Sequence, residues 1–157
     1  MTKEAKQEYT LRISNANRSQ LVVIIYEMLL DYLDDSRKAV DDNDEKQFHD
    51  SIRKAINCIR ELSDSINYEA KTAGNILSLN VYCIRELSAA DIHLDKDRID
   101  GVIKIMKKLY EANKEAAKAD RSSPVMNNSQ SVYAGLTYGK ESLVVNLNDT
   151  QNRGFTI

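Results

Sequence analysis

Histidine and cysteine are the residues of this chain whose side chains most often carry chemistry, and the sequence contains two of each. A di-iron site in a helical bundle requires Glu-x-x-His on each of two helices. Lys46 stands three residues before His49 and Ala90 three residues before His93, so neither histidine completes that motif. No pattern gives either histidine an orienting partner and an adjacent nucleophile. We therefore expect neither an enzyme nor a protein that binds a metal or another cofactor.

The positions of the two cysteines indicate a structural role and not a reactive one. Cys58 and Cys83 form no Cys-x-x-Cys pair, and each falls on or beside an apolar helix face. Such positions favour reduced thiols inside a core over a disulfide or a metal site.

The charge balance argues against nucleic acid as a partner. The chain has 22 basic and 24 acidic residues and a pI near 5.7, so no basic stripe is available for phosphates. Its polar start lacks the apolar region of a secretory signal. Its most apolar run, residues 21–33, is interrupted by Glu27 and Asp31 and is too short to cross a bilayer. We expect a cytoplasmic protein that does not insert into membranes.

Residues 21–33 form the middle of a long first helix with an unusually broad apolar arc. One helical stripe contains Val22, Ile25, Tyr26, Leu29 and Leu33, and a second stripe beside it contains Leu21, Met28 and Tyr32. Only a narrow acidic strip is left for water. This pattern predicts a helix that other helices contact on most of its circumference.

Capping signals divide the rest of the chain into further helices. Asn17 with Gln20 forms a capping-box pattern at the start of the first helix, and Asp44 and Asp95 begin the second and the fourth. The expected helices cover about residues 17–40, 44–66, 70–91 and 95–120. Because short connections between helices of similar length make neighbours antiparallel, we predict an all-α fold, an antiparallel up-down four-helix bundle.

The bundle domain, residues 17–120, is flanked by two different segments. Tyr9, Leu11 and Ile13 alternate with polar residues, which predicts an extended amino-terminal strap within residues 1–16. Residues 121–157 form a non-bundle tail that opens with Pro124 in a Ser- and Asn-rich stretch. Its composition is compatible with disorder, but residues 133–145 are apolar enough to dock on the bundle, and both interpretations stay open.

Two side chains of the third helix fall outside its core stripe. Cys83 and Leu87 belong to the stripe, whereas Leu79 and Tyr82 project about half a turn away, beside Asn75. They predict an outward-facing apolar surface. The alternative is that a neighbouring helix end or the amino-terminal strap covers them.

The order of these signals resembles the FliS family of flagellar export chaperones, which bind flagellin before secretion. The similarity covers about residues 9–119. It is strongest from the entry of the first helix through Tyr26 and in the pattern A-x-N-I-x-x-L-N-x-Y-x-x-R-E-L at 73–87, and KLYE at 108–111 matches a late aromatic position. The chain departs from the family pattern at four positions, with Arg18 in place of Pro, Met28 in place of a small residue, Asn80 in place of Tyr and Tyr110 in place of Trp.

The resemblance implies that the partner is the carboxy-terminal region of flagellin, with the flagellar export gate as a further contact. This cargo is disordered as a monomer, and helix-in-groove binding would cover its apolar surface. The resemblance also implies that the amino-terminal segment lies over the cargo site when cargo is absent. The partner-binding residues that it implies are Tyr9, Leu11, Ile13, Tyr26, Asn75, Leu79, Tyr82, Arg85 and Tyr110.

The same surplus of apolar surface would also be expected in a protein of another class. That protein is a helical adaptor or structural protein that uses the surface to form a homodimer and does not bind flagellin. Stoichiometry separates the two. A concentration-independent monomer that forms a one-to-one complex with a flagellin carboxy-terminal peptide indicates the chaperone. A tight dimer that ignores the peptide indicates the adaptor.

Overall fold

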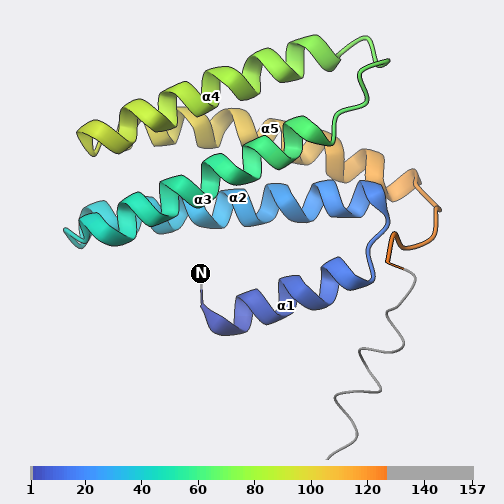
Figure 1. Ribbon diagram of the computed structural model, residues 1–157, viewed down its shortest axis with the longest axis horizontal. Coiled ribbons are helices and arrows are strands. Elements are labelled where there is room, and N and C mark those ends of the chain that lie inside the picture. The colour runs from blue at the N-terminus through green and yellow to red at the C-terminus, as the bar shows by residue number, and fades with distance from the viewer. Residues whose placement is uncertain (1, 127–157) are drawn as a thin grey trace, which may run out of the picture. The chain divides into compact units, whose positions relative to one another are not determined.

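The structure of the protein, a computed structural model, describes residues 2–126. That part of the chain contains five helices and no strand, so the predicted all-α class is confirmed. None of the helices in residues 2–126 is long and apolar enough to cross a membrane. In chain order the helices are α1 (Lys3–Ser14), α2 (Arg18–Asp41), α3 (Glu45–Asp64), α4 (Ala73–His93) and α5 (Lys96–Ala119) (Figure 1).

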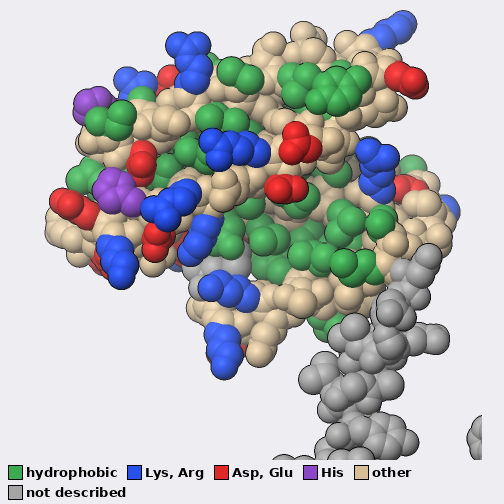
Figure 2. All heavy atoms as spheres, in the orientation of Figure 1, with side chains coloured by type: hydrophobic (Ala, Val, Ile, Leu, Met, Phe, Trp, Pro, Cys, Tyr) green, Lys and Arg blue, Asp and Glu red, His purple; other side chains and the backbone are tan. Residues whose placement is uncertain are grey.

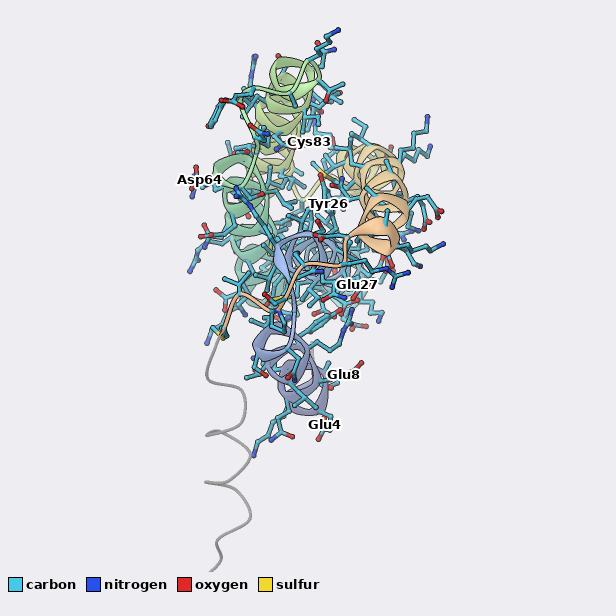
Figure 3. The ribbon with its side chains drawn as sticks, turned by 90° about the vertical axis from the view of Figure 1, so that its right-hand side faces the viewer. Glu4, Glu8, Tyr26, Glu27, Asp64 and Cys83 are labelled. Carbon is cyan, nitrogen blue, oxygen red and sulfur yellow. The ribbon has the colours of Figure 1, made fainter. Side chains whose placement is uncertain are left out.

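Helices α2 to α5 surround one core. Helix α2 packs against α3 and α5, and α4 packs against the same two helices, so α2 and α4 face each other across the core. Consecutive helices run in opposite directions (Figure 1), and Tyr26 and Cys83 point into the space among the four helices (Figure 3). Burial of each large apolar side chain there stabilises the fold by about 1.5–3 kcal/mol. The largest fully buried apolar side chains are Leu29, Leu33, Phe48, Ile52, Ile59, Leu87, Ile99 and Met106.

The prediction of an extended amino-terminal strap is wrong, because residues Lys3–Ser14 form helix α1. Thr2 caps this helix by accepting a hydrogen bond from the Ala5 backbone N–H at 3.2 Å. The alternation of apolar residues that suggested a strand is too short to separate the two periods, since Tyr9 and Ile13 also lie four residues apart on one helix face. No residue of α1 is fully buried.

The predicted helix starts at Asn17, Asp44 and Asp95 are confirmed. Asn17 forms the full capping box, in which its Oδ1 accepts from the Gln20 N–H and the Gln20 side chain accepts from the Asn17 N–H, both at 2.9 Å. Helix α4 begins at Ala73, three residues later than about 70, because the intervening residues form a turn.

Asn17 also joins two distant parts of the chain. Its side chain is buried, and its Nδ2 donates to the backbone carbonyls of Asp120 at 3.4 Å and Ser122 at 3.3 Å. The Ser19 hydroxyl donates to the Asp120 carboxylate at 2.6 Å, and the Val125 N–H donates to the carbonyl of Ala16 at 3.0 Å. The chain that follows α5 is therefore tied to the connection between α1 and α2.

Hydrogen bonds from the Ser19 hydroxyl and, with a smaller effect, from Ser122 lower the pKa of the Asp120 carboxyl to about 2. The carboxylate is consequently ionised across the physiological range. Of the predicted tail, residues 121–126 are described, and the apolar segment 133–145 lies outside the described residues.

Replacing Asn17 tests how much this junction contributes to stability. Asn17→Ala removes a helix cap and the two hydrogen bonds to residues after α5, so the free energy of unfolding should fall by about 1–3 kcal/mol. Asp44→Ala is the matched control, because the Asp44 side chain caps α3 by the same kind of bond to the Gln47 N–H and makes no other hydrogen bond within residues 2–126. Urea denaturation followed by circular dichroism measures both losses. Equal losses would mean that the ties to Asp120 and Ser122 contribute nothing.

Candidate partner-binding surface

The outward apolar surface predicted on the third helix is present on α4. Leu79 and Tyr82 are 38% and 50% exposed, and Asn75 is exposed beside them. Within residues 2–126, no helix end covers these two side chains, and neither does α1. The alternative that they are hidden is therefore wrong for the described part of the chain.

An ion pair shows which side of α4 this surface occupies. Glu86 accepts from the Arg98 guanidinium at 2.8 Å, and Arg98 lies in the first turn of α5. Leu79, Tyr82 and Glu86 follow at spacings of three and four, so they form one row on the side of α4 that faces α5. Arg85 is exposed but lies farther round the helix, away from Leu79.

The core side of α4 holds a polar residue and a thiol. Asn80 is fully buried and donates to the Ser63 hydroxyl at 3.0 Å, while its Oδ1 has no hydrogen-bond partner. Cys83 is also fully buried, and both it and Cys58 are free thiols, as predicted. Burial raises the pKa of each thiol to about 11, which keeps both protonated and unreactive. Within the described residues, no group of three or more potential ligands could hold a metal ion.

Helix α1 lies against α2 through polar contacts. The Tyr9 hydroxyl donates to the Asp31 carboxylate at 2.8 Å, and Arg12 pairs with Glu27 at 2.6 Å. Burial, with the bond to Asp31, raises the pKa of the Tyr9 hydroxyl, so it remains a donor at neutral pH. The Tyr110 hydroxyl of α5 donates to the other oxygen of Glu27 at 3.1 Å. Glu27 therefore connects α1, α2 and α5.

Three residues of the amino-terminal segment, Tyr9, Leu11 and Ile13, were expected to contact a partner. Of these, Tyr9 is hydrogen-bonded to Asp31 of α2. Tyr9 and Ile13 are half-buried, whereas Leu11 is 47% exposed and turned away from the other two. In the same helix, Glu4 and Glu8 point away from the other helices (Figure 3). Helix α1 thus has one face toward α2 and one face toward solvent.

Beside α1, helix α2 presents a half-buried apolar stripe, which combines the second helical stripe of the sequence with Ile25 of the first. The Lys54 ammonium of α3 lies 5.8 Å from the centre of the Tyr32 ring, which places this stripe on the α3 side of α2. Figure 2 shows hydrophobic side chains gathered on the surface between α1 and the helices above it. We call this surface the α2 stripe, and it consists of Leu21, Ile25, Met28 and Tyr32.

Two cavities border these surfaces. One of about 390 Å³ lies between α1, α2 and α5, with Val23 and Ile24 in its wall and Arg12 and Lys114 among its basic residues. The other, of about 170 Å³, lies at the end of the core where α3 leads into α4. Apolar side chains of α2 line both cavities.

Two residues expected at the binding surface have other positions. Tyr26 is 2% exposed and belongs to the core, where it borders the smaller cavity, so a partner cannot reach it without rearrangement of the helices. Tyr110 is half-buried and bonded to Glu27, with the Lys114 ammonium 5.1 Å from its ring centre. Both helical periodicity and family resemblance select such aromatic positions, but neither distinguishes burial from exposure.

Comparison with known proteins gives a family for most of the chain. The family model described as "FliS: Flagellar protein FliS" matches residues 1–120. Those residues include α1 to α5 and all the surfaces described above. A search of curated proteins finds no match.

Tyr9→Phe tests whether the polar contacts hold α1 in place. The substitution removes the hydroxyl that donates to Asp31 and keeps the ring, so amides of α1 should exchange with solvent about 3- to 10-fold faster. Hydrogen exchange read by mass spectrometry or NMR measures this change. Glu8→Ala is the control, because Glu8 points away from α2 (Figure 3). Unchanged exchange in Tyr9→Phe would show that apolar contacts alone dock α1.

Proposed function

Since the chain belongs to the FliS family of flagellar export chaperones, we propose that it binds the carboxy-terminal segment of flagellin in the cytoplasm and delivers it to the flagellar export gate. The bound segment would be kept from polymerising before secretion. In this proposal the protein acts by covering apolar surface and carries out no catalysis.

The observation that supports this function best is the attachment of α1. Its polar side-chain contacts to α2 are the Tyr9 hydrogen bond to Asp31 and the Arg12 ion pair with Glu27, and none of the residues of α1 is fully buried. Exposed and half-exposed ion pairs each contribute only about 0–1 kcal/mol. Helix α1 is therefore easier to displace than any helix of the core.

The α2 stripe is the surface that such a displacement would uncover. It lies next to α1 and already has half-exposed apolar side chains, Met28 and Tyr32 among them. An amphipathic cargo helix would place its own apolar residues along this stripe, as in other helix-in-groove complexes. The row of Leu79 and Tyr82 offers a second apolar contact on α4.

The energetics suit a chaperone that must release its cargo. Ordering a disordered segment costs about 2–5 kcal/mol or more of the gross interaction energy, which weakens the complex. In this proposal α1 also competes with cargo for the surface beside the α2 stripe, and that competition weakens the complex further. Cargo affinity is thereby held below the value that the apolar area alone would give.

The alternative function, a dimerising adaptor, predicts a different response to cargo. Titration of the full chain with a flagellin carboxy-terminal peptide, monitored by calorimetry and light scattering, separates the two. A monomer that forms a one-to-one complex supports the chaperone. A dimer that does not respond to the peptide would rule out the proposed function.

Removing residues 1–13 tests whether α1 occupies the cargo site. If α1 competes with cargo, the truncated protein should bind the flagellin peptide with equal or higher affinity, because the competing helix is absent. Isothermal titration calorimetry measures the dissociation constants of both proteins. A large loss of affinity on truncation would mean that α1 clamps the cargo and does not compete with it.

Leu79→Asp and Tyr82→Asp test the second contact. Both side chains are exposed, so the helices should stay folded, while a carboxylate in an apolar contact should weaken cargo binding about tenfold or more. Ser88→Asp places the same carboxylate at an exposed position on another side of α4 and should leave cargo affinity unchanged. Circular dichroism reports the fold of each variant. If Tyr82→Asp unfolds the protein, Tyr82 has a structural role.

A further inference from the structure

The α2 stripe stays partly open to solvent although α1 and α3 pack beside it. Its four apolar residues, Leu21, Ile25, Met28 and Tyr32, are each half-buried, and the last three pack against the outside of the core. From Leu21 to Tyr32 the stripe follows α2 for about 16 Å, at about 1.5 Å per residue. A continuous apolar strip of this kind is more typical of a binding surface than scattered exposed residues are.

The described chain ends beside this stripe. After α5, residues 120–126 pass the start of α2 and end on the α3 side of it (Figure 3). The Val125 N–H donates to the Ala16 carbonyl at 3.0 Å, and Ala16 stands five residues before Leu21. The α2 stripe lies on the same side, because the Lys54 ammonium of α3 is 5.8 Å from the Tyr32 ring centre. The described chain therefore ends near the Leu21 end of the stripe.

Hydrogen bonds hold the backbone just before that end. Asn17 donates to the Ser122 carbonyl at 3.3 Å, and Val125 is held by Ala16. The apolar segment 133–145, which lies outside the described residues, begins seven residues after Met126. Seven residues extend over at most about 25 Å, which is longer than the stripe. The segment therefore begins within reach of the α2 stripe.

Residues 133–145 have the composition and the length that the stripe requires. The two charges of the segment, Lys140 and Glu141, cancel. Thirteen residues are about 20 Å long as a helix and longer when extended, so either conformation would cover the whole stripe. Val125 and Met126, which precede the segment, are apolar and more than half exposed. The large apolar residues of the segment are Tyr133, Leu136, Tyr138, Leu143, Val144 and Val145.

We infer that residues 133–145 of the same chain lie on the α2 stripe when no cargo is bound. Their apolar side chains would cover Ile25, Met28 and Tyr32, and removal of both surfaces from water would drive the contact. A segment joined to its site by a short linker acts at an effective concentration of roughly millimolar. The segment of the same chain is therefore favoured over a second copy of the protein as the occupant.

The consequence for cargo rests on the proposed function. If flagellin binds the α2 stripe, residues 133–145 compete with it directly, in addition to the competition from α1 beside the stripe. The apparent affinity for cargo falls in proportion to the fraction of molecules whose stripe is uncovered. Cargo binding would then displace two segments of the chaperone, one from each side of the core sequence.

Hydrogen exchange and methyl NMR on the full chain test the docking. Amides of residues 133–145 should exchange at least about tenfold more slowly than in a free peptide of the same sequence. Leu136→Asp with Leu143→Asp should remove this protection and shift the methyl resonance of Met28. The methyl resonance of Met106, which is fully buried in the core, should stay unchanged.

Asn127→Asp with Asn128→Asp is the control, because it adds the same two charges before the apolar segment. It should alter neither the protection nor the Met28 resonance. The inference is overturned if residues 133–145 exchange as fast as the free peptide, or if the double leucine variant leaves the Met28 resonance in place. Protection that is lost on dilution of the protein would also overturn it, since a second copy would then be the occupant.

Addition of the flagellin carboxy-terminal peptide tests the competition separately. Cargo on the α2 stripe should remove the protection of residues 133–145, and Leu136→Asp with Leu143→Asp should strengthen peptide binding about 3- to 10-fold. A peptide that binds while the protection persists would contradict the competition. A peptide that does not bind at all would defeat the proposed function and the competition with it, whereas docking measured in the free chain would stand.

Discussion

Helix α2 has more apolar circumference than its two core neighbours can cover, and the positions of the other elements follow from this excess. Its core side meets α3 and α5, with Leu29 and Leu33 fully buried. Its remaining apolar side chains form the α2 stripe and the wall of the larger cavity. Helix α1 lies over this side without sealing it. If α2 were apolar only on its core side, α1 would have no apolar surface of α2 to pack against.

The two kinds of attachment in the molecule differ in strength for a physical reason. The four core helices are held by side chains such as Phe48 and Ile99 that are completely removed from water. Helix α1 is held by a hydrogen bond and an ion pair at partly exposed carboxylates, and solvent screens and competes for both contacts. Local opening therefore concentrates in α1, and the core that carries the other surfaces is left intact.

The sequence allows the caps, the core stripes and the position of Leu79 and Tyr82 outside the core stripe to be predicted, because each depends on spacing within one helix. It leaves open whether another element covers these two side chains. It does not reveal that Tyr9, Leu11 and Ile13 belong to a helix, since five residues fit either period. It also does not show that Glu27 binds both Arg12 and Tyr110. That arrangement depends on how helices distant in the chain pack together. Tyr26 shows how far sequence patterns can be used, because it matches both the core pattern and the expected binding pattern. The structure places it in the core.

The junction at Asn17 gives the movement of α1 a direction. Helix α1 and α2 meet at residues 15–17, which are fastened to the chain after α5, so this point serves as a fixed pivot. A helix of 12 residues is about 18 Å long, and its amino end travels farthest when it swings. The Tyr9 bond to Asp31 is farther from the pivot than the Arg12 pair with Glu27. If α1 is displaced as proposed, its amino end separates first, so that α2 would be uncovered first near Tyr32 and last near Leu21.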